Sequence, residues 1–286
     1  MRHFSRTVRI VLGMSFAITA CTTAMGGGIT ADVGLTPPLD RWIFRTQVRY
    51  VERDDDPTGM GREMQMYAVP VVLAYGLRPN VTVIARQIAF HRRMDMPLVD
   101  AEVTGLGDFM LMTKWRALRV NRRDYILGIA PVLGVEAPTG DDDFGSDTWD
   151  ALTGAFLTAR RGPLGADLNV EYVLNAIDDR GGGATRPGDA LTANLALSYQ
   201  FTLDRDATLS LWPVLELTYT DVESDRRNGG GVADSGGHLL TAAPGVKFAR
   251  QSFMLEALVQ LPVSEDLNGN QLDRGIGMLA GLRYLF

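Results

Sequence analysis

The sequence predicts an all-β protein: a transmembrane, up-and-down antiparallel β-barrel of about twelve strands. Apolar side chains recur at every second position through most of residues 41–286, the period of a strand that separates two environments. Short turns and long polar loops alternate strictly between these stretches, as in a barrel with all its turns at one end. Aromatic residues recur near the ends of the stretches, where an apolar band meets the membrane surfaces.

The N-terminus predicts export, and residues 1–20 are expected to be removed before folding. A cationic start precedes an apolar stretch that is too short to cross a membrane. The end of this stretch resembles a bacterial lipoprotein box, which makes Cys21 a candidate for lipidation. Ordinary cleavage near Ala20 or Ala24 is the alternative. Because Cys21 is the only cysteine, no internal disulfide is expected.

Twelve strands are predicted within residues 41–286, after a Gly- and Pro-punctuated tether or plug at residues 21–40. The clearest alternation occurs in residues 41–50, 67–75, 124–136, 164–174, 191–201, 208–220, 252–261 and 275–286. Four less regular strands lie near residues 80–90, 104–118, 148–160 and 238–249. In residues 252–261, Met254 and Leu258 are apolar where the pattern favours polar side chains.

The connections between the strands fall into two sets. The short set comprises residues 76–80, 119–123, 160–165, 202–206 and 250–252. The long, polar set comprises residues 52–63, 91–103, 139–148, 178–188, 221–237 and 264–273. Short periplasmic turns and long extracellular loops are typical of outer-membrane barrels. An even number of strands returns the last strand to the end at which the first begins.

The chain ends on GIGMLAGLRYLF, an alternating strand without a polar tail. In hydrocarbon an unpaired backbone N–H or C=O costs several kcal/mol, so an open sheet edge cannot persist there. We therefore expect residues 275–286 to close the ring against residues 41–50. Tyr284 and Phe286 also resemble the C-terminal assembly signal of bacterial outer-membrane proteins. A soluble β-sandwich is the alternative, but strands of roughly 10–13 residues are long for that fold.

Composition limits the partners. The net charge is −6 and no basic cluster occurs, which argues against nucleic acid. The expected location is the bacterial outer membrane. The expected partners are outer-membrane lipid, lipopolysaccharide and the outer-membrane assembly machinery.

Three stretches resemble one known family. The residues that carry the resemblance are Gly105, Gly107 and Asp108 in GLGDFMLMTKWRAL, Pro138, Thr139 and Gly140 in GVEAPTGDDDFG, and the closing GLRYLF. They are similar to phenol-degradation MetA-pathway proteins, and the resemblance runs over most of residues 60–286. It implies an outer-membrane barrel, often called a transporter. The link to phenol breakdown is not carried over to this chain.

We expect a passive channel or uptake barrel for small, hydrophobic or aromatic molecules. Twelve strands lie between barrels filled by their own side chains and barrels with an open aqueous channel. The predicted lumen-lining residues are Arg45, Arg49, Glu136, Asp167, Glu171, Trp212, Glu216, Lys247, Glu256 and Arg283. Because charges face the lumen of any such barrel, a purely structural role is equally consistent. A structural barrel plugged by residues 22–40, without transport, is the alternative function.

An enzyme at the barrel rim is a third hypothesis, with His91 or His238 as the base. No motif orders a catalytic set around either histidine, so we expect no enzyme and no catalytic residue. Acidic loops at Asp54–Asp56, Asp141–Asp143 and residues 266–273 are expected to be solvated rather than metal-binding. No cofactor is expected.

Overall fold

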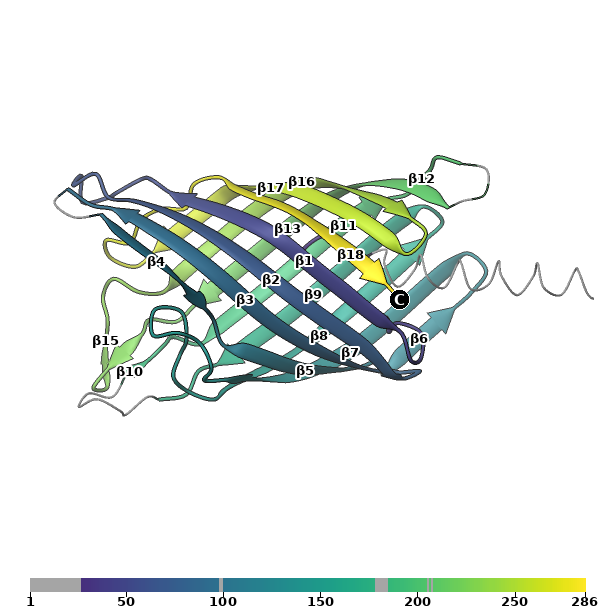
Figure 1. Cartoon of the computed structure of the whole chain (residues 1–286), viewed down its shortest axis with the longest axis horizontal. Coiled ribbons are helices and arrows are strands. Elements are labelled where there is room, and N and C mark those ends of the chain that lie inside the picture. The colour runs from purple at the N-terminus through teal and green to yellow at the C-terminus, as the bar shows by residue number, and fades with distance from the viewer. Residues whose placement is uncertain (1–26, 98–99, 178–184, 205, 207) are drawn as a thin grey trace, which may run out of the picture.

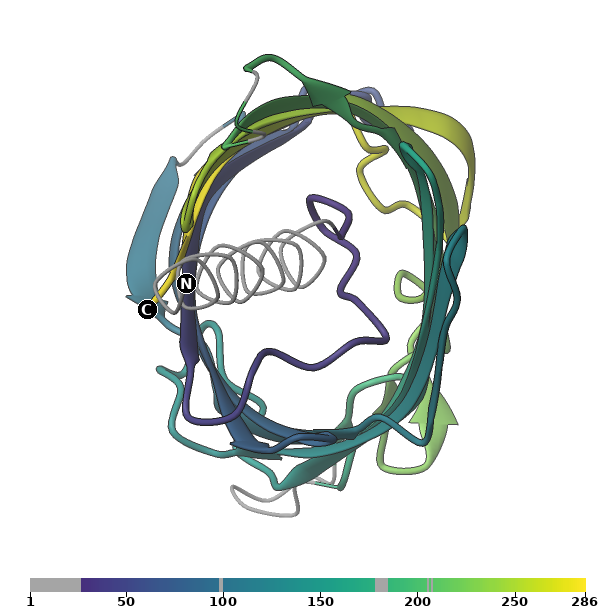
Figure 2. The same cartoon turned by 90° about the vertical axis from the view of Figure 1, so that its right-hand side faces the viewer.

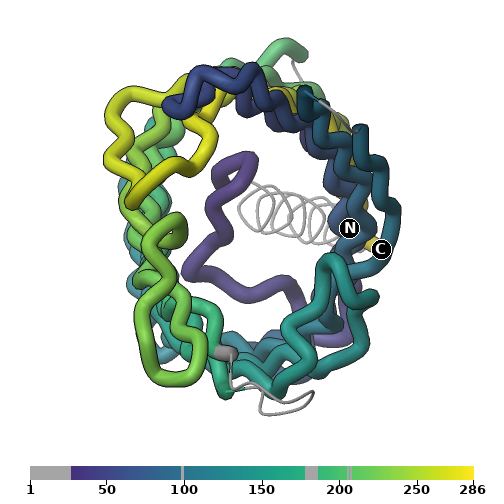
Figure 3. The backbone as a smooth tube through the Cα atoms, turned by 90° about the vertical axis from the view of Figure 1, so that its left-hand side faces the viewer, coloured from purple at the N-terminus to yellow at the C-terminus, as the bar shows by residue number. Residues whose placement is uncertain are grey.

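The computed structural model describes residues 27–97, 100–177, 185–204, 206 and 208–286. These residues form a closed antiparallel β-barrel, seen from the side in Figure 1 and along its axis in Figures 2 and 3. Within the described ranges, no helix is long and apolar enough to cross a membrane.

In the described residues the wall has twelve strand positions, which confirms the predicted fold and strand number. Two positions are interrupted: β4, β5 and β6 follow one another along one position, and β12 continues β11. The wall contains β1 (Trp42–Arg53), β2 (Glu63–Arg78), β3 (Val81–Asp95), β4 (Ala101–Leu106), β5 (Phe109–Trp115), β6 (Leu118–Asn121), β7 (Tyr125–Ala137), β8 (Asp150–Arg161), β9 (Leu164–Leu174), β11 (Ala190–Tyr199), β12 (Phe201–Thr202), β13 (Leu209–Val222), β16 (Gly237–Arg250), β17 (Phe253–Leu267) and β18 (Gly277–Leu285). The short strands β10 (Thr185–Arg186), β14 (Arg226–Arg227) and β15 (Gly230–Gly231) form a separate sheet in the loops.

The first and last strands seal the barrel. Their register runs from Ile43 opposite Leu285 to Val51 opposite Gly277. Beyond it, Trp42 and Phe286 exchange two backbone hydrogen bonds, of 2.9 and 3.0 Å. The pairing of β11 with β13 completes the ring. Among the residues that the structure describes, no edge strand of the wall is left unpaired, and the prediction that the C-terminal strand closes the ring is confirmed.

Turns and loops separate to opposite ends of the barrel, as Figure 1 shows. The turn end carries Phe286 and the start of β1, and by the rule for outer-membrane barrels it faces the periplasm. Aromatic pairs mark both membrane surfaces. At the turn end they are Trp42–Tyr75 (4.5 Å between ring centroids), Tyr199–Phe201 (4.7 Å) and Tyr284–Phe286 (5.7 Å); at the loop end they are Tyr50–Tyr67 (5.1 Å) and Tyr219–His238 (6.2 Å).

The two faces of the wall have opposite chemistry. Outward leucines such as Leu133 and Leu215 are 68% and 44% exposed, whereas inward polar groups such as Gln47, Lys247 and Glu216 are at most 2% exposed. An apolar surface of this extent is stable only against lipid. The polar interior, in turn, must pair its own charges or hold a polar occupant.

We expect the C-terminal aromatic residues to act in assembly. Deleting Phe286 together with Tyr284→Ser removes the two backbone bonds to Trp42 and the stacked ring pair at the seam. We expect a large loss of folded barrel in outer-membrane fractions, measured by the heat-dependent gel mobility of closed barrels. Phe248→Ser, which also removes an outward aromatic ring, is the control. Equal losses from both changes would contradict a special role for the C-terminus.

Candidate functional site

Residues 27–37 lie inside the barrel, and we call them the luminal segment. Figures 2 and 3 show this segment crossing the lumen, seen from the turn end and from the loop end. Residues 38–41 then lead into β1, with the Asp40 N–H donating to the Gly76 carbonyl at 2.9 Å. The predicted export signal and Cys21 lie outside the described residues, as does the first part of the predicted tether or plug.

The luminal segment follows a bent path without regular secondary structure, and apolar residues occupy every second position from Ile29 to Leu35. Ile29, Ala31, Val33 and Leu35 are all 5% exposed or less. Its backbone lies so close to the wall that a Cβ atom on Gly34 would be 2.5 Å from the Phe156 carbonyl oxygen. A larger residue at this position would push the segment off the wall.

Apolar residues of the wall receive the luminal segment. A buried cluster comprises Ile29, Ala31, Ala196, Trp212, Val214, Ala243, Leu258 and Leu279. Leu258 is one of the two apolar exceptions in the predicted strand at residues 252–261. The other, Met254, packs with Ala249 and Leu285. Leu258 therefore breaks the alternation because its lumen side is covered by the chain itself.

Glu216 binds the backbone of the luminal segment. Its carboxylate accepts the N–H of Thr30 at 3.1 Å, and also the N–H of Ile29 and the hydroxyl of Thr30. Asn194 donates to the same hydroxyl oxygen at 2.6 Å. Hydrogen bonds to a carboxylate are stronger than those between neutral groups, so this is a principal anchor.

Cationic and amide side chains bind the carbonyls of the segment. Lys247 donates to Gly27, Arg283 to Gly28 at 3.2 Å, Gln47 to Ile29 at 3.0 Å and Lys114 to Val33 at 2.9 Å. Each lysine nitrogen also lies over an aromatic ring, 5.1 Å from the Trp212 ring centroid for Lys247 and 5.9 Å from that of Phe156 for Lys114. The wall therefore recognises main chain more than side chain.

Glu256 holds two of these groups, Gln47 and Arg283, in place and also binds Arg45. It accepts hydrogen bonds from Arg45 at 3.2 Å, Gln47 at 2.5 Å and Arg283 at 3.1 Å. Arg283 and Gln47 direct further N–H groups at the segment. A buried carboxylate shared by two guanidinium groups is largely compensated, which permits these charges in the interior.

A second anchor lies on β8 and β9. Arg160 and Thr158 both donate to Asp167, at 2.7 and 2.6 Å, and Thr158 accepts the Gly34 N–H at 2.9 Å. Asn169 forms two hydrogen bonds with the backbone of Asp32, at 2.5 and 2.9 Å.

All ten predicted lumen residues are placed in the interior, but they divide into two groups. Seven bind the luminal segment, pack against it or hold a residue that binds it: Arg49, Asp167, Trp212, Glu216, Lys247, Glu256 and Arg283. Arg45 pairs with Glu256 at 3.2 Å, and Glu136 and Glu171 lie nearer the loop ends of their strands, where Glu136 pairs with Arg86 at 2.7 Å. The prediction from sequence did not include Gln47, Lys114, Thr158, Asn169 and Asn194. Each of them nevertheless occupies one of the alternate positions of its strand whose side chains face the lumen.

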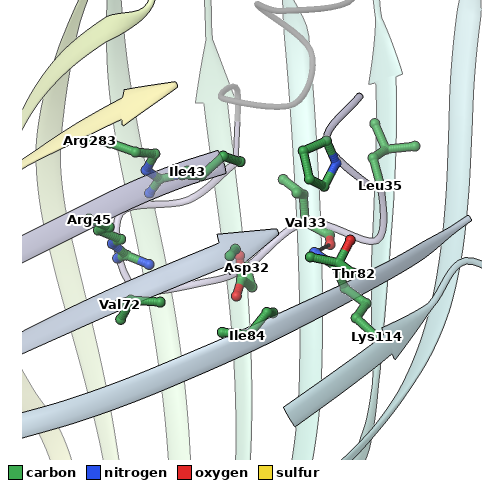
Figure 4. A pocket seen from close by; sticks show the side chains of 12 residues that line it. Asp32, Val33, Leu35, Ile43, Arg45, Val72, Thr82, Ile84, Lys114 and Arg283 are labelled. Carbon is green, nitrogen blue, oxygen red and sulfur yellow. Dashed lines mark hydrogen bonds between the residues drawn. The ribbon is translucent and has the colours of Figure 1, made fainter. Parts of the chain in front are cut away.

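A small cavity lies beside the luminal segment. It has a volume of about 40 Å³ and lies between Asp32, Arg45, Thr82 and Lys114, and Figure 4 shows the side chains that line it. Such a volume corresponds to roughly three water molecules. The Arg45 Nη2 and Thr82 Oγ1 atoms are buried there without a hydrogen-bond partner in the described residues.

The two internal stretches with the family resemblance meet at the loop end. The Asp108 carboxylate accepts the N–H groups of Thr139 at 3.0 Å, Gly140 at 2.8 Å and Ser146 at 2.7 Å, together with the Ser146 hydroxyl at 2.8 Å. Phe144, in the same loop, stacks on Phe90 with 5.1 Å between ring centroids. Asp108 thus fixes the loop of residues 138–149 at the extracellular mouth.

We call the hydrogen bonds from Thr139, Gly140 and Ser146 to the Asp108 carboxylate the Asp108 clasp. They predict that the stability of this loop depends on pH. Burial alone would raise the pKa of this carboxyl, but the hydrogen bonds from Ser146, Gly140 and Thr139 together lower it. Because the folded pKa lies below the unfolded value of about 3.9, the clasp stabilises the loop above that pH. The stabilisation is lost as the pH falls through the lower, folded value.

We expect Asp108→Ala to increase amide hydrogen exchange in residues 139–146 by at least about tenfold at pH 7, since several N–H groups lose their acceptor. The difference from wild type should shrink as the carboxyl protonates. Asp142→Ala, at an exposed position of the same loop, is the control. Equal rates of amide hydrogen exchange in the two variants would show that Asp108 does not hold this loop in place.

The rim histidines face away from the lumen. His91 contacts the Thr104 hydroxyl at 2.8 Å and Glu102 at 3.7 Å, and His238 lies 3.9 Å from Asp266. Of the acidic loop residues, Asp56 binds Arg62 at 2.7 Å and Asp141 accepts the Leu106 N–H at 2.7 Å. Among the described residues, no group of three or more His, Cys, Asp or Glu side chains could hold a metal ion.

The barrel is similar to known outer-membrane proteins. A family model described as "Putative MetA-pathway of phenol degradation" matches residues 39–266. The COG4313 outer membrane channel from Pseudomonas putida F1 has a TM-score of 0.68 and 16% identity, covering 87% of this chain and 96% of that chain. The beta domain of the Bordetella autotransporter Brka has a TM-score of 0.50 and 13% identity, covering 86% and 100%. No curated protein matches the sequence. The fold is that of a bacterial outer-membrane barrel, and the expected location is confirmed.

Proposed function

Because the chain belongs to the MetA-pathway phenol-degradation family and forms a channel-like barrel of the outer membrane, we propose that it is a passive channel for small molecules, closed by its own luminal segment. The observation that carries the proposal is the way the segment is held. Hydrogen bonds and apolar packing hold the segment against the wall. Because such contacts break and re-form, the segment can leave the wall and return to it.

The lining supports a solute with an apolar body and a polar group. One side of the interior is an apolar cluster of Ile84, Met110, Met112, Val132, Leu152 and Phe156. Charged groups nearer the loops, including the Arg86–Glu136 pair, supply the polar side. Pockets for small molecules typically combine apolar walls with a few placed polar groups. Small aromatic alcohols fit this description better than sugars do.

Liposome flux tests this proposal. Protein reconstituted with and without residues 27–37 is offered a small aromatic alcohol and, separately, a sugar. We expect the shortened protein to pass both solutes, with preference for the aromatic alcohol, and the intact protein to pass them slowly. Failure of either protein to pass any small solute would overturn the proposal.

A closed structural barrel is the second candidate. The observation in its favour is the number of wall residues that hold the segment across the lumen. The two candidates differ in the intact protein. A channel has measurable open events, whereas a structural barrel has none.

A further inference from the structure

An apolar groove lies on the outer face of the barrel, at the periplasmic ends of β7, β8, β9 and β11. It has a volume of about 500 Å³, and its lining is almost entirely apolar. Its floor is a row of residues paired across four neighbouring strands, in the order Leu127, Ala159, Ala166 and Leu197. Because the two central residues are alanines between two leucines, the row is hollow in the middle.

A second row borders the groove on its periplasmic side. It runs Tyr125, Arg161, Leu164 and Tyr199 across the same four strands. Tyr125, Leu164 and Tyr199 are 41%, 57% and 40% exposed. Tyrosine and arginine at this level match the boundary between hydrocarbon and headgroups.

Elsewhere the wall has the same arrangement without the hollow. The row Leu209, Arg250, Phe253 and Tyr284 occupies the corresponding periplasmic position on β13, β16, β17 and β18. The row above it is Leu211, Phe248, Leu255 and Leu282, with large residues where the groove has alanines. The groove is therefore a local feature rather than a property of the whole wall.

Positive charge gathers at the mouth of the groove. Arg161 is exposed beside Tyr125, and the adjoining turn carries exposed Arg122 and Arg123. These two arginines line a second hollow, of about 330 Å³, at the periplasmic mouth of the lumen, which inward-facing Arg160 and Trp212 also line and which shares Tyr125 with the groove. Within the described part of the chain, none of the three arginine side chains forms a hydrogen bond or an ion pair, and Asp124 is the acid of the turn.

We propose that this groove binds one anionic phospholipid of the periplasmic leaflet. An acyl chain occupies the hollow over Ala159 and Ala166, and the headgroup phosphate meets Arg161 and the arginines of the turn. Arginine is suited to phosphate because its planar guanidinium donates two parallel hydrogen bonds. A lipid in this place orders the β7–β8 end of the barrel next to the periplasmic mouth.

Native mass spectrometry tests the proposal on the full protein in detergent. The probes are phosphatidylglycerol and phosphatidylethanolamine with identical acyl chains. We expect one retained phosphatidylglycerol, preferred over phosphatidylethanolamine by roughly fivefold, the effect of about one interfacial arginine. Arg161→Gln should abolish most of the preference. Arg250→Gln, at the matching position over the filled row, should leave it unchanged.

A second pair of variants tests the acyl-chain site. Ala159→Leu with Ala166→Leu fills the hollow and should reduce retention of both lipids, whereas Ala257→Leu, outside the groove, should not. Heat-dependent gel mobility shows that each variant is folded. Equal retention of both lipids by the wild type, equal effects of Arg161→Gln and Arg250→Gln, or full retention after filling the hollow would each overturn the proposal.

Discussion

Deleting residues 27–37 is expected to raise the single-channel conductance severalfold. With the segment seated, the cavity beside it is about 40 Å³, comparable to a few water molecules. Without the segment, the lumen of a twelve-stranded barrel is wider than that of eight-stranded barrels, which their own side chains fill. Planar-bilayer recordings of the intact and shortened proteins measure the difference.

A peptide supplies the control for this deletion. Synthetic residues 27–37, added to the periplasmic side of the shortened protein, should block the current because the wall residues that bind the segment remain. A scrambled peptide of the same composition should block less, since Ile29, Ala31 and Gly34 then no longer meet their matching positions on the wall. Equal conductance of the intact and shortened proteins would show that the segment does not limit flow.

Glu216→Ala is expected to have the largest effect of any single substitution in the lumen. It removes the acceptor for two backbone N–H groups and for the Thr30 hydroxyl. Each buried donor left unsatisfied costs about 1–3 kcal/mol. A total of about 3 kcal/mol lowers the ratio of seated to unseated segment by roughly a hundredfold. The fraction of time spent at the high-conductance level measures this ratio.

Two further variants separate the role of Glu216 from a general change of charge. Glu216→Gln keeps an oxygen acceptor and should give an intermediate open fraction. Glu136→Ala also removes a lumen-facing carboxylate, but Glu136 pairs with Arg86 rather than with the luminal segment. We therefore expect Glu136→Ala to leave the open fraction near that of the wild type. If Glu216→Ala and Glu136→Ala raised the open fraction equally, Glu216 would not hold the luminal segment in the way proposed.

The fold could be predicted because a membrane barrel repeats one local rule along the chain. Each strand needs one apolar face for lipid and one mainly polar face for the lumen. Whether a side chain points inward or outward therefore follows from its odd or even position along the strand, which we call its parity. The pairing of the terminal strands also followed, since hydrocarbon tolerates no open edge. For the same reason, the ten lumen candidates could be placed in the interior from their positions in the strands.

The sequence alone therefore determined the wall of this protein: its strands, their two faces and their closure. The tertiary structure decided what the lumen residues do. Glu216, Lys247 and Arg283 occupy inward-facing strand positions, as Glu136 does. They bind the backbone of residues 27–30, whereas Glu136 pairs with Arg86. Parity fixes only the face on which a side chain lies. Its partners depend on register across strands and on the path of residues 27–37, which are set by contacts between parts of the chain up to 255 residues apart.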